Sequence, residues 1–141
     1  MAEDAFECAL QALRYRDRTG FEIEEHLRAR GFSDEDRSRA VETLCRTGLI
    51  DDERFARARA SSLAERGAGN ALIRARLAEA GLARDLVDDA VDAVEPEATR
   101  ARRIVASRGA SPKTARYLYG KGFSEGVVRS VIAEGDDDEL G

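Results

Sequence analysis

Hydrophobic residues recur along the chain in a pattern that repeats three times. Each copy contains the run Leu-x-x-x-Gly-apolar, with a further apolar residue fourteen positions before the leucine. The leucines of the three runs are Leu27, Leu77 and Leu118, and the earlier apolar residues are Leu13, Leu63 and Ile104. A repeat of 40 to 50 residues with helical spacing is typical of arrays built from similar helical units. The pattern therefore predicts three such units.

Each unit is predicted to contain three short helices. In the first unit the helices span about 5–16, 19–30 and 33–47, and Thr19 and Glu22 have the spacing of a capping box at the start of the second. The second unit has helices over 51–66, 70–80 and 84–94. The third has helices over 97–108 and 124–134, with a middle helix that begins at Ser111 and Pro112. The glycine of each repeated run ends a middle helix.

The predicted fold is all-α, with three tandem three-helix, helix-turn-helix-like repeats in an elongated, curved array. We place the repeats at 1–50, 51–95 and 96–135, followed by an acidic, disordered tail at 136–141. One unit of this size buries little apolar surface by itself, so neighbouring units must cover each other's open faces. We expect the core of the middle unit to contain five apolar residues: Phe55, Leu63, Ile73, Leu77 and Leu86.

Composition supports the helical prediction and adds a charge pattern. The chain of 141 residues has 43% hydrophobic and 36% charged residues, no Trp, and a net charge of −5. Counted by repeat, the first two units each carry −3, the third carries +5 and the last six residues carry −4. The third unit is therefore able to contact phosphates or an acidic protein surface, although the whole chain is acidic.

The remaining composition indicates a cytoplasmic protein. Cys8 and Cys45 are too few for a disulfide framework, and their helical context predicts reduced thiols in the core. No apolar run approaches the roughly 18 residues of a membrane span, and the first residues lack the features of a signal peptide.

A search for catalytic chemistry finds no constellation that an enzyme would need. His26 is the single histidine and has no partner at metal-ligand or general-base spacing. The acidic run 51–53 fits a helix start better than a magnesium site. Gly67 and Gly69 lack the Lys-Ser/Thr of a phosphate loop. We expect a binding protein with no catalytic residue, metal site or cofactor.

Arginine is the residue type with the most scope for recognition, because its fork binds carboxylates and phosphates through two hydrogen bonds. The competing interpretation is that most arginines only form surface ion pairs with nearby Asp and Glu. The candidate partner-facing cations are Arg54, Arg57, Arg66, Arg74, Arg100, Arg102, Arg103, Lys113, Arg116 and Lys121.

The middle of the chain carries a run that resembles a known family. The run 48–56, GLIDDERFA, with Arg66, Gly69, Ile73 and Gly81 after it, is similar to the signature of the RecX regulatory proteins, and residues 12–33 resemble the first repeat of that family. The resemblance covers about residues 5–134. It implies a protein of three tandem three-helix units that binds the RecA recombinase filament and inhibits its recombinase, ATPase and coprotease activities, without catalytic residues of its own.

The positive charge of the third unit supports a second hypothesis, DNA binding. The basic third unit is also consistent with a helix-turn-helix-like DNA-binding protein that acts as a repressor or an architectural factor. The expected partners are thus the RecA filament and, through the third repeat, single- or double-stranded DNA, with no membrane partner and a monomeric chain. We expect little reading of base sequence, because Gln11 and Asn70 are the only residues of their two types.

Overall fold

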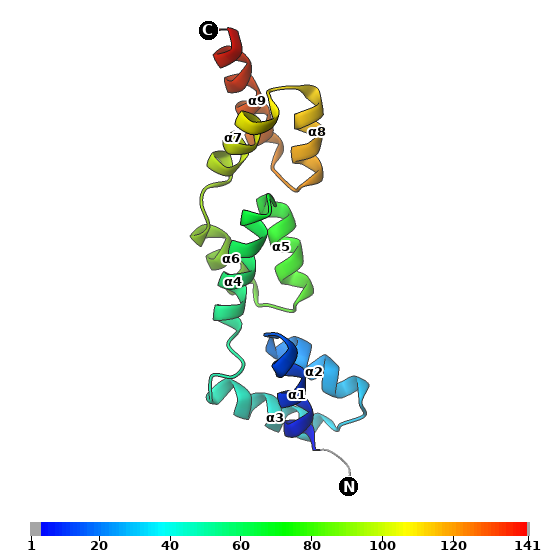
Figure 1. Ribbon diagram of the computed structural model, residues 1–141. Helices are drawn as coiled ribbons and strands as arrows, with labels where there is room; N and C mark the ends of the chain where they lie inside the picture. The colour runs from blue at the N-terminus through cyan, green and yellow to red at the C-terminus, as the bar shows by residue number, and fades with distance from the viewer. Residues whose placement is uncertain (1–3, 141) are drawn as a thin grey trace.

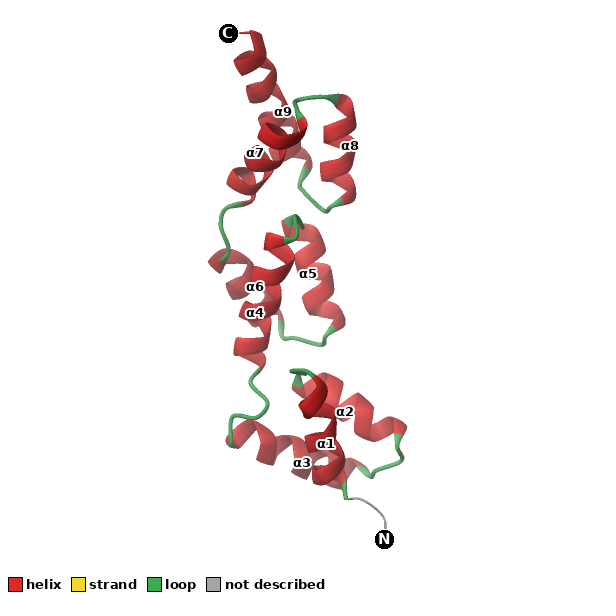
Figure 2. Ribbon diagram, viewed as in Figure 1, coloured by secondary structure: helices red, strands yellow, loops and turns green. Residues whose placement is uncertain are grey.

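The chain folds into short helices joined by tight loops. The computed structural model describes residues 4–140, with side chains to residue 137, and over that range it contains nine α-helices and no strand (Figures 1 and 2). The helices are α1 (Ala5–Tyr15), α2 (Gly20–Ala29), α3 (Asp34–Arg46), α4 (Asp52–Glu65), α5 (Asn70–Glu79), α6 (Arg84–Ala93), α7 (Glu97–Arg108), α8 (Pro112–Gly120) and α9 (Glu125–Leu140).

The helices form three consecutive groups of three, arranged along one long axis (Figure 1). Each group encloses its own hydrophobic cluster, centred on Leu27 in the first, Leu77 in the second and Leu118 in the third. These leucines are the ones that mark the repeated sequence pattern, and each has no exposed surface. The predicted all-α fold of tandem three-helix units is confirmed.

The predicted core of the middle unit agrees with the structure. Leu63, Ile73 and Leu77 are buried, while Phe55 and Leu86 are partly buried and pack against them. Small residues fill much of the remaining volume, since Ala56, Ala60, Ala68 and Ala90 belong to the same cluster. The helices of a unit can therefore approach closely around a small core.

Helix boundaries follow the local signals in the sequence. The Thr19 hydroxyl accepts a hydrogen bond from the Glu22 amide, and the Glu22 carboxylate accepts one from the Thr19 amide, so the predicted capping box is present. The Ser111 hydroxyl caps α8, with Pro112 in its first turn.

Contrary to the prediction from its helical context, Cys45 does not lie in the core. It is exposed, because α3 turns Ala40 and Leu44 toward the core instead.

The acidic end of the chain is a second correction. We predicted a disordered tail from residue 136, but α9 continues to Leu140. Two contacts hold α9 in place just before this extension. Glu134 forms an ion pair of 2.9 Å with Arg102 on α7, and Gly135 packs so closely on Ala110 that an added Cβ would lie 2.7 Å from the Ala110 Cβ. Residue 141 of the predicted tail lies outside the described residues.

The middle helices of successive units meet end to end. Between the first and second units, the Thr19 hydroxyl donates to the Ala80 carbonyl (2.6 Å) and the Gly20 amide to the Asp52 carboxylate (2.9 Å). The Phe21 ring lies against Gly81, where an added Cβ would be 2.1 Å from its Cγ. Gly81 has a φ of +78°, so both its backbone and its contact require glycine.

The second and third units meet in a similar way. The amides of Gly69 and Ala71 donate to the carbonyls of Lys121 (2.8 Å) and Gly122 (3.1 Å). At both junctions the start of one middle helix faces the end of the next, so the helix dipoles align. At the second junction free amides donate directly to free carbonyls, whereas at the first the Ala80 carbonyl accepts from the Thr19 hydroxyl. As a result α2, α5 and α8 lie on the same side of the array (Figure 1).

Candidate partner-binding surface

Arg100 corrects the prediction of partner-facing cations, because it is buried at the second junction with 5% of its surface exposed. Its guanidinium donates to the carbonyls of Ala68 (2.5 Å) and Glu95 (2.8 Å) and to the side-chain oxygen of Asn70. Its central carbon also lies 5.8 Å from the centre of the Phe123 ring. The side chain therefore joins the second unit to the third.

Burial and nearby carboxylates act on Arg100 in opposite directions. Burial lowers the pKa of Arg100, and the negative charges of Glu97 and Glu95 offset part of that effect. The guanidinium fork matches several fixed acceptors at once, which is why arginine suits this position better than lysine.

Glu97 is a second junction residue, and sequence reasoning missed it. Its carboxylate accepts hydrogen bonds from the Asn70 amide (2.6 Å) at the start of α5, and from the amide (3.2 Å) and hydroxyl (2.8 Å) of Ser124 just before α9. A carboxylate at two helix starts is favourable for both dipoles. In the sequence Glu97 is simply an acid after Pro96, at the start of its own helix, and no local signal reveals the two other helices.

Half of the candidate cations are engaged in exposed ion pairs. Such pairs add little stability and exchange partners readily, so these residues stay accessible. The pairs are Arg54 with Asp51 (3.8 Å), Arg57 with Glu53 (2.9 Å), Arg74 with Asp88, Arg102 with Glu134 (2.9 Å) and Arg103 with Glu95 (2.6 Å). The hydrogen bond from Arg102 lowers the pKa of Glu134 and raises that of Arg102.

The last four candidates are gathered around α8 and its junction with the second unit. Lys113, Arg116 and Lys121 belong to α8 or follow it directly, and no acidic residue occurs between positions 98 and 124. Arg66 ends α4, and the neighbouring Gly67 is close enough to Lys121 that an added Cβ would lie 3.8 Å from its Cε. Within the described residues, none of these four cations forms an ion pair, unlike the pairs on α4 and α7.

Two further features of this region were not predicted. The Arg108 guanidinium stacks 3.5 Å above the centre of the Tyr117 ring, and Tyr119 is 46% exposed. Gly120, on the outward side of the helix, has open space around it. We call this surface the α8 cationic face; it consists of Arg66, Arg108, Lys113, Arg116, Tyr117, Tyr119, Gly120 and Lys121.

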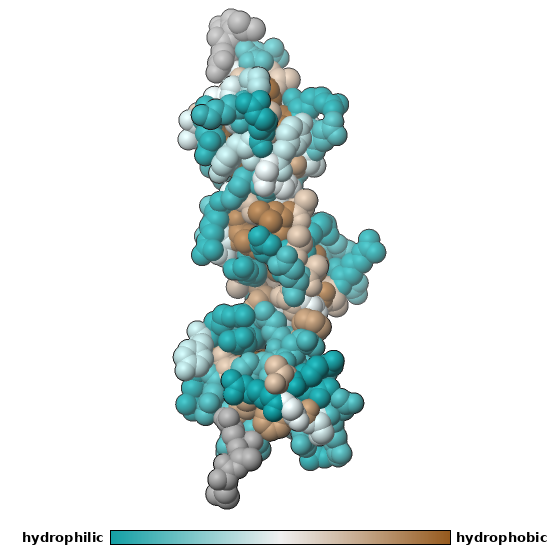
Figure 3. Space-filling model, turned by 90° about the vertical axis from the view of Figure 1, so that its right-hand side faces the viewer, coloured by the Kyte–Doolittle hydropathy of each residue, from teal (hydrophilic) through white to brown (hydrophobic). Residues whose placement is uncertain are grey.

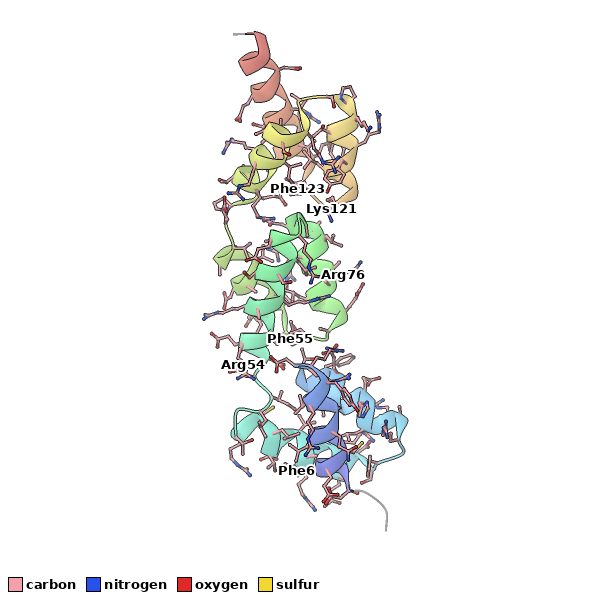
Figure 4. The ribbon with its side chains drawn as sticks, viewed as in Figure 1. Phe6, Arg54, Phe55, Arg76, Lys121 and Phe123 are labelled. Carbon is pink, nitrogen blue, oxygen red and sulfur yellow. The ribbon has the colours of Figure 1, made fainter. Side chains whose placement is uncertain are left out.

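The α8 cationic face lies on the side of the array that also carries α2 and α5. Figure 3 views this side and shows apolar surface over the second unit beside mainly hydrophilic surface over the third. Figure 4 places Lys121 and Phe123 at the end of the third unit that meets the second. The surface character thus changes from apolar to hydrophilic along one side of the molecule.

Other kinds of site find little support in the part of the chain that the structure describes. It contains no group of three His, Cys, Asp or Glu side chains placed to hold a metal ion. None of its helices is both long enough and apolar enough to cross a membrane.

Comparison with known proteins assigns the units to a family. Residues 5–44 match the model of the first three-helix domain of RecX, and residues 51–91 match that of the second. The chain belongs to the RecX family. The boundaries of the two RecX models correspond to α1–α3 and α4–α6, the helical groups that form separate hydrophobic clusters.

Individual RecX proteins are similar to this chain over nearly its whole length. The regulatory protein RecX of Halorhodospira halophila is 30% identical and covers 98% of this chain and 92% of its own length. That of Chromohalobacter salexigens is 31% identical over 89% of this chain and 88% of its own. The crystal structure of RecX from Lactobacillus salivarius superposes with a TM-score of 0.80 at 21% identity, covering 94% of both chains, which supports the same fold for all three units.

Proposed function

We propose that this chain binds the filament of the RecA recombinase and inhibits its recombinase, ATPase and coprotease activities. The observation that carries the proposal is membership of a family of regulatory proteins by a chain whose three units stack into one long array. A long, laterally exposed array suits a partner that is itself extended. The protein acts in the cytoplasm as a monomer and performs no chemistry of its own.

The two junctions support this mode of binding. Each is held by buried or backbone hydrogen bonds, such as Thr19 to Ala80 and Gly69 to Lys121, so the units present their exposed helices in a defined order. A pre-ordered surface loses less conformational entropy on binding than a chain of loosely tethered units. The array is therefore suited to contact several sites of a filament at once.

The direct test is a titration of the full chain into RecA filaments assembled on single-stranded DNA. We expect a dose-dependent fall in the DNA-dependent ATPase rate at micromolar protein, together with co-sedimentation of the chain with the filaments. The full chain heated past its unfolding transition provides the control for nonspecific protein effects. Unchanged ATPase rates and no co-sedimentation would rule the function out.

DNA binding by the third unit is the second candidate, and the unpaired cations of the α8 cationic face favour it. Contacts with phosphates release counterions, so affinity for naked single-stranded DNA should fall at least about tenfold for a fourfold rise in salt if three phosphates are neutralised. Fluorescence anisotropy with a labelled oligonucleotide measures this slope. Undetectable binding at low salt would exclude the candidate.

A further inference from the structure

We infer that the α8 cationic face is the docking surface for an acidic protein surface on the partner filament. The inference rests on the proposed function and specifies which side of the array makes the contact and what chemistry it meets. In place of ten cations spread over two units, this surface has five cations and two tyrosines, on α8, at the end of α7 and at the junction with the second unit.

The first support is the contrast between paired and unpaired cations. On α4 and α7, Arg57 and Arg102 already have carboxylate partners within 2.9 Å. On α8, Lys113 and Arg116 have no ion pair within the described residues, and the helix has no acid of its own. Exposed charges of one sign repel each other, and an opposing acidic surface relieves that repulsion.

The second support is the shape and composition of the face. Tyr119 is 46% exposed, and Tyr117 holds the Arg108 guanidinium over its ring. Tyrosine and arginine are enriched where protein interfaces have most of their binding energy, because both offer large contact area and directional hydrogen bonds. Gly120 has open space around it, so a partner backbone can approach the helix closely there.

The third support is the net charge of the rest of the chain, which distinguishes a protein partner from a nucleic acid. The first two units each carry a net charge of −3, and α9 ends in acids that include Asp136 and Asp137. A long phosphate strand that reaches past α8 is repelled by the net negative charge of the rest of the chain, whereas an acidic patch on a protein can be confined to the size of the face. Charge complementarity therefore favours the protein surface.

The face is also continuous across the junction. Gly67, the residue that follows Arg66 in the second unit, lies beside the Lys121 side chain of the third, and the Lys121 carbonyl accepts a hydrogen bond from the Gly69 amide. The hydrogen bonds of Arg100 hold the two units in this arrangement. The partner thus meets cations from two units at fixed relative positions.

The experiment measures binding of the full chain, labelled at the exposed Cys45 on α3, to RecA filaments on single-stranded DNA and to the same naked DNA. The test variant carries Lys113→Glu and Arg116→Glu. The matched control carries Arg39→Glu and Arg129→Glu, which reverse two cations with side chains 71% and 73% exposed outside the face. A third variant exchanges Lys113→Arg and Arg116→Lys and keeps the charge.

We expect the test variant to lose about tenfold or more in affinity for the filament, while the control and the charge-conserving variant stay within about threefold of the unmodified chain. Circular dichroism should show equal helix content in all four proteins. If the test and control variants have equal affinity for the filament, whether both bind or both fail, the α8 cationic face is not the docking surface. The proposed function still holds in that case, provided that the unmodified chain binds the filament.

Two other outcomes would also overturn the inference. If the unmodified chain binds naked DNA as tightly as the filament, and the test variant loses the same factor on both, the face recognises nucleic acid. If the unmodified chain does not bind the filament at all, the proposed function fails, and the docking surface fails with it.

Discussion

Gly69 and Gly122 meet backbone to backbone across the junction of the second and third units. A Cβ added to Gly69 would lie 2.3 Å from the Phe123 nitrogen and 2.4 Å from the Gly122 carbonyl carbon. These atoms belong to the main chain and to a turn that is fixed by its own hydrogen bonds, so they have little freedom to move aside. The contact explains why a glycine stands at the N-cap of α5, where a capping side chain would otherwise be favoured.

The substitution Gly69→Ala is therefore expected to destabilise the chain. Overpacking at this contact should lower the free energy of unfolding by about 1 to 3 kcal/mol, measured by urea denaturation. Gly126→Ala is the matched control, since Gly126 lies in α9 with open space around it and should gain up to about 1 kcal/mol from better helix propensity. Equal effects at the two glycines would contradict the close contact.

Arg100 gives the second prediction. Replacement by Met removes the guanidinium and leaves the buried Ala68 carbonyl and the partly buried Glu95 carbonyl without their donor, which should cost about 2 to 4 kcal/mol of unfolding free energy. Arg103→Met, which removes an exposed ion pair with Glu95, should cost at most about 1 kcal/mol. Similar losses of unfolding free energy for both variants would show that the buried hydrogen bonds of Arg100 add no more stability than an exposed ion pair.

The contacts of Gly69 and Arg100 between units could not be predicted from the sequence. The three units and their helices were accessible from it because their signals are local: Leu77 recurs at a fixed distance from its glycine, and Thr19 stands three residues before Glu22. The sequence favours a surface position for Arg100, because its acceptors Ala68 and Asn70 lie about thirty residues earlier and come into reach only when two units stack.

The candidate surface shows the same division. The unpaired cations of α8 could be counted from the sequence, because no acid stands near them on the helix. The stacking of Arg108 on Tyr117 depends on how α7 and α8 cross, and the close approach of Gly135 to Ala110 depends on how α9 packs against the loop before α8. Neither contact has a signature in the spacing of the residues.

Leu77 provides a prediction for the core of the middle unit. It has no exposed surface, so Leu77→Ala should lower the free energy of unfolding by about 2 to 5 kcal/mol through lost burial and a residual cavity. Leu49→Ala is the control at a position 49% exposed, and should change stability by less than about 0.5 kcal/mol. Chemical denaturation monitored by circular dichroism measures both. A small effect at Leu77 would place it outside the core.

Thr19 tests the junction between the first and second units. Thr19→Val keeps the shape but removes the hydroxyl that caps α2 and donates to the Ala80 carbonyl at 2.6 Å. The loss should be about 1 to 3 kcal/mol, because a buried acceptor and a helix start both lose their partner. Thr43→Val, which removes an exposed hydroxyl bonded within its own helix, should have a much smaller effect in the same denaturation experiment.

The ion pair of Arg102 and Glu134 makes stability depend on pH in a defined direction. The hydrogen bond from Arg102 lowers the pKa of Glu134 below its ordinary value of 4.5, so the folded state holds the ionised carboxylate more strongly than the unfolded state does. The contribution of the pair to the free energy of unfolding is therefore complete above about pH 4.5 and is lost as the pH falls through the lowered pKa.

Carbon-detected NMR titration should give a midpoint below 4.5 for Glu134, and Arg102→Met should raise that midpoint. Glu134→Gln, which cannot titrate, identifies the signal, and a midpoint unchanged by Arg102→Met would show that the pair does not hold α9 to α7 in solution.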